Sequence, residues 1–136
     1  MIDGCNAIEI SGLVKTFGET NAVDGVALSV PRGTTLGLLG PNGAGKSTTL
    51  KMLIGMLRPT AGTVQVLGME IPAFAPKIKQ RVGYVPEAHH IYRWMTVGEV
   101  LAFSRAMFDS WNDELCNELL DVFQLPSNRS VRALSK

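Results

Sequence analysis

The chain has 136 residues, and its 13 Lys and Arg against 12 Asp and Glu give a formal net charge of +1 at pH 7. This balance argues against a basic nucleic-acid-binding surface and an acidic disordered tail, and the 46% of apolar residues suffices for the core of one domain. No apolar run nears the roughly 18 residues that cross a bilayer, and we recognise no secretory leader at the start of the sequence. Cys5 and Cys116 stand far apart in the sequence, which suits free thiols in a reducing compartment. We therefore expect a soluble intracellular protein.

Glycine is concentrated in the first part of the chain, where 13 of the 14 glycines lie at or before Gly83. This split predicts a turn-rich strand region followed by a mainly helical one, with a boundary near residues 84–90. In the first region, alternating apolar residues predict strands over 7–14, 23–30 and 64–66. Continuous apolar runs over 35–39 and 82–85 predict two further strands that are buried on both faces.

Helices are predicted from apolar spacing and from capping residues. Over 47–57, four apolar residues recur at i, i+3, i+4 and i+7 and predict one buried helix face: Leu50, Leu53, Ile54 and Leu57. A shorter helix is expected over 75–81. Thr96 and Glu99 have the spacing of a capping box, and Asn112 can cap a second helix that ends before Pro126.

The loop between the 35–39 strand and the 47–57 helix matches the pattern G-x-x-x-x-G-K-[ST]. Its residues are Gly40, Pro41, Asn42, Gly43, Ala44, Gly45, Lys46 and Ser47. The glycines allow the backbone to present N–H groups to phosphate oxygens, and Lys46 adds a cation for the β- and γ-phosphates. Ser47 offers a hydroxyl to Mg²⁺ at the positive end of a helix. The loop therefore predicts a nucleotide-phosphate site.

The segment from Gly40 to Gly68, GPNGAGKSTTLKMLIGMLRPTAGTVQVLG, resembles the Walker A region of ABC-transporter ATPase subunits. VKTFGETNAVDGVALSVPRG resembles the family's opening strands, RVGYVPEAHHIYRWMTVGEVLAF its Q-loop, and the final ALSK the start of its signature motif. The resemblance implies an α/β P-loop NTPase fold of the ABC ATPase type, here incomplete. It assigns residues 1–86 to a β-subdomain plus the Walker A part of a RecA-like core, and 87–136 to the Q-loop and a truncated helical subdomain.

The resemblance also implies a set of nucleotide-binding residues. These are Phe17, Val23, Gly40, Pro41, Asn42, Gly43, Ala44, Gly45, Lys46, Ser47 and Thr48, for ATP with Mg²⁺. Phe17 stands where the family has an aromatic that stacks on adenine, and the alternative is a core residue at a strand end. Val23 is either part of the adenine site or an ordinary strand-core residue.

Glu87 stands where the family usually has Gln, a residue that reaches Mg²⁺ and the attacking water. A carboxylate is a stronger Mg²⁺ ligand, but it cannot donate a hydrogen bond when ionised. The resemblance makes Lys46 and Glu87 the catalytic candidates, and it makes Ser47 and Glu87 the candidate ligands of Mg²⁺. The alternative is an ordinary solvated loop residue after Pro86.

Several other residues have two interpretations. His89 and His90 are adjacent and lack partners at ligand spacing, which disfavours a zinc site. The apolar residues of 91–95 are either a surface for a membrane subunit or packing within the helical subdomain. Cys116 is expected to fill the core. Leu134 and Ser135 match the signature motif, Lys136 departs from it, and the motif is cut through at that point.

The resemblance implies the ATP-binding portion of an ABC-type ATPase that couples Mg·ATP hydrolysis to transport, with export as the expected direction. Its implied partners are transmembrane permease subunits and a second ATPase subunit in a head-to-tail dimer, with no nucleic acid. The full-length protein is expected in the cytoplasm, peripheral on the inner face of the cell membrane. The chain alone is expected to bind nucleotide at most. The alternatives are a non-catalytic nucleotide-binding regulatory module and a soluble ABC protein that works on ribosomes.

Overall fold

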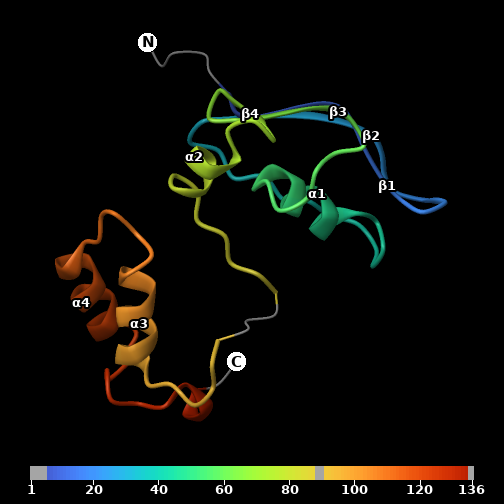
Figure 1. Cartoon of the computed structure of the whole chain (residues 1–136). Helices are drawn as coiled ribbons and strands as arrows, with labels where there is room; N and C mark the ends of the chain where they lie inside the picture. The colour runs from blue at the N-terminus through green and yellow to red at the C-terminus, as the bar shows by residue number, and fades with distance from the viewer. Residues whose placement is uncertain (1–5, 88–90, 135–136) are drawn as a thin grey trace. The chain divides into compact units, whose positions relative to one another are not determined.

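The computed structural model describes residues 6–87 and 91–134 of the chain (Figure 1). It divides into two compact units, Met1–Tyr84 and Val85–Lys136. The first unit carries the strands, and the second unit is helical within its described residues. The assignment of residues 1–86 and 87–136 to the parts of an ATPase stays a prediction.

The first unit contains a four-stranded antiparallel sheet with the order β2-β1-β3-β4. Its strands are β1 (Asn6–Phe17), β2 (Thr20–Pro31), β3 (Ala61–Val66) and β4 (Met69–Ile71). The first three match the strands expected from alternation, although β1 and β2 run beyond both predicted ends and β3 begins before its predicted start. β4 was not predicted, because its three residues are too few for a period-two pattern to stand out.

A bulge bends β1 before its end. The pairing of β1 with β3 shifts register between Ser11 and Val14, and Gly12 has a positive φ of 55°. Gly62 at the start of β3 packs so closely here that a Cβ on it would lie 2.2 Å from the Gly12 carbonyl oxygen. The bulge therefore directs the last residues of β1, which end at Phe17.

Two helices, α1 (Lys46–Leu53) and α2 (Ala75–Lys79), lie on one side of the sheet and close its core (Figure 1). The core consists of Ile10, Leu13, Val23, Met52, Val64, Val66, Ile71 and Ile78. The predicted buried face of α1 was wrong in part, because Leu50 is 44% exposed and Met52 is fully buried. The helix turns its Thr49 and Met52 side toward the sheet, so the contact with the strands decided the face.

The two strands expected over 35–39 and 82–85 do not form. Leu39 is 93% exposed and Val85 is 82% exposed, where the apolar runs predicted burial on both faces. A strand satisfies its backbone N–H and C=O groups only by pairing with a neighbour. Neither segment has such a neighbour in the parts of the chain that the structure describes, so the apolar pattern alone does not produce strands here.

The second unit contains α3 (Val97–Arg105), α4 (Asp113–Val122) and a short 3₁₀ helix, η1 (Val131–Ala133). The predicted capping box is confirmed: the Glu99 backbone N–H donates to Thr96 Oγ1, and the Thr96 N–H donates to Glu99 Oε2 at 2.7 Å. Asn112 Oδ1 caps α4 by accepting from the Leu115 N–H at 2.9 Å. These local signals fixed both helix starts.

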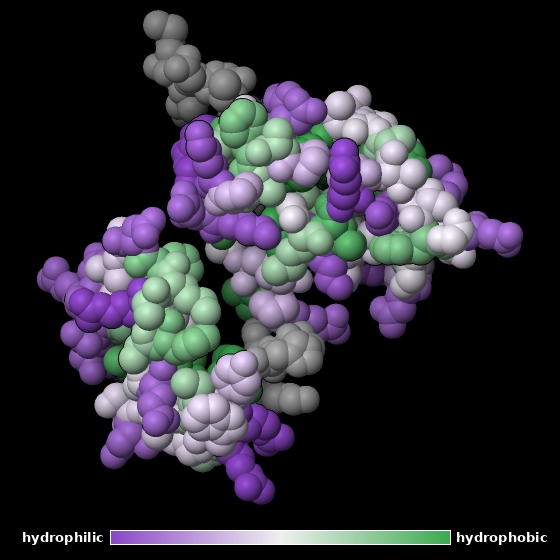
Figure 2. Space-filling view, viewed as in Figure 1, coloured by the Kyte–Doolittle hydropathy of each residue, from purple (hydrophilic) through white to green (hydrophobic). Residues whose placement is uncertain are grey.

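The apolar stripe of α4 is more exposed than a core stripe, with Leu115 at 48%, Leu119 at 44% and Val122 at 66%. Figure 2 shows hydrophobic residues at the surface of both units, among hydrophilic ones. None of the helices in the described residues is long and apolar enough to cross a membrane.

Candidate functional site

The loop before α1 adopts backbone angles that suit glycine. Gly43 and Gly45 have φ values of 88° and 81°, and Gly40 has a φ of 154°. Side-chain-bearing residues avoid these angles, so the turn requires glycine at both fixed glycine positions of the G-x-x-x-x-G-K-S pattern and also at Gly43, which stands at a variable position. The loop closes on itself through a hydrogen bond from the Ala44 N–H to the Pro41 carbonyl, 3.2 Å long.

Gly45 packs directly against β2. A Cβ on Gly45 would lie 2.2 Å from the Ala22 carbonyl oxygen and 3.0 Å from Val23 Cγ2. Only a residue without a side chain allows this approach, so the end of the loop is seated on the strand. Val23 itself is 4% exposed and belongs to the hydrophobic core. This burial favours the strand-core interpretation of Val23, and a contact with adenine stays a prediction.

Lys46 is the first residue of α1, and its side chain turns back over the loop. The Lys46 ammonium donates to the carbonyl oxygens of Gly40 at 2.6 Å and Pro41 at 2.7 Å. These bonds hold the compact positive charge of the ammonium next to the glycine-rich turn. A strongly hydrated point charge of this kind suits phosphate oxygens.

The N-terminal end of α1 faces the same loop. The N-cap residue is Gly45, which provides no side-chain cap, and the first turn carries no acidic residue. The first intrahelical bond runs from the Thr49 N–H to the Gly45 carbonyl at 2.8 Å, so the N–H groups before it are left for other acceptors. Ser47 and Thr48 add hydroxyls in this turn. The helix end, the glycine loop and Lys46 together favour an anion such as a phosphate.

Phe17 lies at the end of β1 and is 49% exposed. That exposure disfavours the interpretation of Phe17 as a core residue and suits an aromatic surface that stacks on a ligand. The Lys15 ammonium lies 5.0 Å from the centroid of the Phe17 ring, within the range of a cation–π contact.

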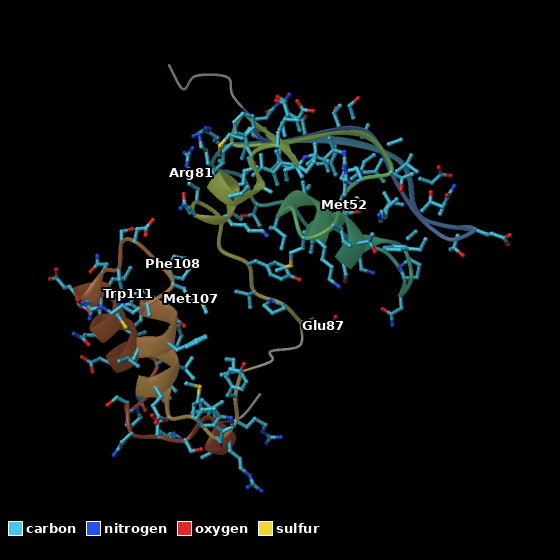
Figure 3. All side chains as sticks on the ribbon, viewed as in Figure 1. Met52, Arg81, Glu87, Met107, Phe108 and Trp111 are labelled. Carbon is cyan, nitrogen blue, oxygen red and sulfur yellow. The ribbon has the colours of Figure 1, made fainter. Side chains whose placement is uncertain are left out.

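The remaining predicted site residues belong to the second unit. Glu87 is exposed and follows Pro86 in a segment that is neither helix nor strand (Figure 3). Leu134 is half-buried after η1. Ser135, His89 and His90 lie outside the described residues, so their predicted roles stay predictions. No cluster of three or more His, Cys, Asp or Glu forms a metal site among the residues that the structure describes.

Ile91, Tyr92 and Trp94 are exposed by 44%, 56% and 73%, and the Tyr92 and Trp94 rings lie 5.7 Å apart. This exposure disfavours packing within the helical unit as the role of these three side chains. Met95, the fourth apolar residue of 91–95, is partly buried.

An apolar groove lies within the second unit between α3 and α4, and its lining includes Phe108 and Trp111, which Figure 3 labels. Its lining is almost wholly apolar and includes Leu101, Leu115 and the partly exposed Cys116. It offers no charged side chain, so it cannot serve as the phosphate site.

Two features of the site were not predicted: the seating of Gly45 on β2, and the ammonium of Lys15 over Phe17. The first depends on a contact between segments far apart in the sequence and left no local signal. The contact of Lys15 with Phe17 did have a local signal in the sequence. Residues at i and i+2 of a strand share a face, so the two side chains were expected to be neighbours.

Comparisons with known proteins agree on one family. Residues 23–136 match the family model described as "ABC transporter". The chain is 41% identical over 126 residues to the daunorubicin/doxorubicin resistance ATP-binding protein DrrA of Streptomyces peucetius, covering 90% of this chain and 38% of that protein. It is 50% identical over 94 residues to the Nod factor export ATP-binding protein I of Ralstonia nicotianae, covering 69% and 29%.

A solved structure described as an ATP binding subunit of an ABC transporter matches this fold with a TM-score of 0.82 at 27% identity. The match covers 96% of this chain and 56% of that one. The chain therefore spans between 29% and 56% of the length of these similar proteins.

Proposed function

The chain belongs to the ABC transporter family, and from that premise we propose that its loop from Gly40 to Ser47 binds the phosphates of Mg·ATP in a transport ATPase. The observation that carries this proposal is the Lys46 ammonium, held by the Gly40 and Pro41 carbonyls beside the N-terminal end of α1. Positive charge, backbone N–H groups and a glycine turn meet at one place, and a polyphosphate is the ligand that uses all three.

Each part of the loop has a role in this proposal. The N–H groups of residues 43 and 45–48 donate to phosphate oxygens, while the Ala44 N–H keeps its bond to the Pro41 carbonyl. Lys46 exchanges its two carbonyl partners for the β- and γ-phosphates. Because an ammonium that already makes short bonds to neutral carbonyls gains from a charged acceptor, this exchange is favourable. Phe17 receives the adenine ring on its exposed face.

Mg²⁺ fits the oxygen donors that the chain provides. Ser47 is exposed in the first turn of α1, and its hydroxyl oxygen is a donor of the type that Mg²⁺ prefers. Mg²⁺ usually binds through one or two protein groups plus substrate phosphates and water, so the Ser47 hydroxyl alone can be its protein ligand in the first unit, and Glu87 as a further ligand stays a prediction. When bound, the ion neutralises negative charge on the phosphates.

For the full-length protein, we propose that ATP hydrolysis drives export through transmembrane permease subunits, with a second ATPase subunit as a head-to-tail partner. The similar proteins named for drug resistance and for Nod factor export support the export direction. In this assembly the protein is peripheral on the cytoplasmic face of the cell membrane.

The test is a calorimetric titration of the full-length protein with Mg·ATP, comparing Lys46→Ala with Lys51→Ala. Lys51 is an exposed lysine in the last turn of the same helix and controls for loss of charge. Loss of a charge-assisted hydrogen bond of about 1.5–3 kcal/mol predicts roughly a tenfold to hundredfold weaker affinity for Lys46→Ala. Lys51→Ala is expected to bind within about twofold of the wild type.

Equal affinities for both variants would contradict the proposed site. Phosphate release by the full-length protein with its membrane partners tests the enzymatic part. Turnover that Lys46→Ala abolishes supports a transport ATPase, whereas binding without turnover supports the non-catalytic regulatory module.

A further inference from the structure

We propose that Lys15 is a positioning residue for adenine binding, because its ammonium lies over the Phe17 ring and is itself hydrogen-bonded to the loop that follows α1. This inference rests on the proposed function, in which Phe17 stacks on the base. The inference adds Lys15 to the proposed nucleotide site, which so far consists of the glycine loop and Phe17. All the residues that it involves lie within the first unit.

One ammonium makes both contacts that the proposal needs. Lys15 Nζ lies 5.0 Å from the Phe17 ring centroid, and it also donates to the Arg58 carbonyl oxygen at 2.9 Å. Lys15 is half-buried, whereas Phe17 is 49% exposed. The hydrogen bond to Arg58 therefore fixes the cation, and the cation in turn limits where the exposed ring can lie.

Further hydrogen bonds tie the same loop to the residues on either side of Lys15. The Thr60 N–H donates to the Val14 carbonyl at 2.8 Å, and the Thr16 N–H donates to Thr60 Oγ1 at 3.0 Å. Arg58 and Thr60 thus contact three successive residues of β1. These hydrogen bonds join the end of β1 to the segment that follows α1. The first residue of that helix is Lys46 of the phosphate loop.

This connection places the two ends of the proposed nucleotide site on one continuous piece of chain. The phosphate loop enters α1, and the residues after α1 hold the strand end that carries Phe17. A base platform fixed relative to the phosphate loop lowers the ordering cost of binding, which is the usual gain from pre-organisation.

The chemistry of the ring also favours a cation on one face. Phe has no hydroxyl, so its exposed ring has no hydrogen bond of its own that would fix its orientation. An ammonium over one face restrains it and leaves the other face for a stacked base. An exposed cation–π contact predicts about a twofold to fivefold effect on affinity.

The experiment titrates the full-length protein with Mg·ATP and with Mg·tripolyphosphate, which carries the phosphate chain without the base. Lys15→Met is expected to weaken ATP binding about twofold to fivefold and to leave tripolyphosphate binding unchanged. Lys15→Arg keeps a cation and a donor and is expected to restore ATP binding. Unchanged tripolyphosphate affinity also shows that Lys15→Met is folded.

A matched control exists in the same unit. The Lys77 ammonium on α2 lies 5.7 Å from the ring centroid of Phe74, the N-cap residue of that helix, and the proposal gives this similar pair no part in binding. Lys77→Met is therefore expected to bind ATP as the wild type does. In a Phe17→Leu background, Lys15→Met is expected to cause no further loss, because the ring that it positions is gone.

The outcomes separate the inference from the proposed function. Equal weakening for ATP and tripolyphosphate would overturn the inference in favour of a direct phosphate contact by Lys15. Wild-type ATP affinity in Lys15→Met, or a loss that persists in Phe17→Leu, would also overturn it while leaving the proposed function standing. A wild-type protein that binds neither ligand would overturn the proposed function and the inference together.

Discussion

Replacing Gly45 by Ala tests how the phosphate loop is held. The new Cβ would lie 2.2 Å from the Ala22 carbonyl oxygen, about 1.2 Å inside the shortest ordinary van der Waals contact of 3.4 Å. That oxygen belongs to the backbone of β2, so it cannot swing aside as a flexible side chain would. Either the strand or the loop must move.

The cost has two parts. A residue with a Cβ at the Gly45 φ of 81° costs about 1–2 kcal/mol, and displacing a packed backbone adds about 1–3 kcal/mol. Gly43→Ala is the matched control, because its φ is 88° and nothing lies within 4 Å of its added Cβ. We expect about 2–5 kcal/mol of destabilisation for Gly45→Ala and about 1–2 kcal/mol for Gly43→Ala.

Amide hydrogen exchange measures this difference locally. The free energy of opening is read from the protected amides of β1 and β2, which pair with each other where Gly45 rests on β2. If Gly45→Ala lowers that free energy no more than Gly43→Ala does, the loop is not seated on β2 and the reasoning fails.

Three further predictions concern the second unit. Glu87→Gln is expected to keep Mg·ATP affinity within about tenfold, since one ligand among several changes, and a larger loss in calorimetric titration would make Glu87 an essential ligand. Thr96→Ala removes the confirmed cap and is expected to lower the opening free energy of α3 by about 1 kcal/mol while leaving α4 unchanged, measured by amide exchange. Hydrogen bonds from the Thr96 N–H and then the Thr96 hydroxyl hold the pKa of Glu99 below its ordinary value, against a smaller effect of burial. The ionised Glu99 carboxylate therefore stabilises the fold at pH values above its ordinary pKa, and this stabilisation is lost as pH falls through the lowered pKa. Protection of the α3 amides from exchange should drop on acidification in the wild type but not in Glu99→Gln.

Features encoded locally were predictable from the sequence. The strand ladder of β1 and β2 follows from alternation of apolar residues, and the starts of α3 and α4 follow from Thr96 and Asn112. The glycines of the phosphate loop were predictable because each has a conformation that other residues avoid. The expected α/β fold of an ABC ATPase is confirmed by the match to a solved ATP-binding subunit.

Features that depend on distant partners were not predictable. The apolar segments 35–39 and 82–85 carry a strand pattern but form none, because a strand needs a neighbour that the pattern cannot supply. The rotation of α1, which buries Met52 and exposes Leu50, was decided by the shape of the sheet beneath it. Gly45 contacts Ala22, and the Lys15 ammonium donates to the Arg58 carbonyl oxygen. Both contacts join segments that lie far apart in the sequence, and no sequence pattern indicates that they are close in space.

The central claim is that the loop from Gly40 to Ser47 binds the triphosphate of ATP, and backbone amide NMR of the full-length protein tests it most directly. On titration with Mg·ATP, the largest chemical-shift changes are expected at the amides of residues 43–48, with a second group at Phe17. Tripolyphosphate should reproduce the first group and leave the Phe17 amide unmoved. Saturating Mg·ATP with no shifts in residues 43–48, or with shifts centred on the apolar groove between α3 and α4, would contradict the account.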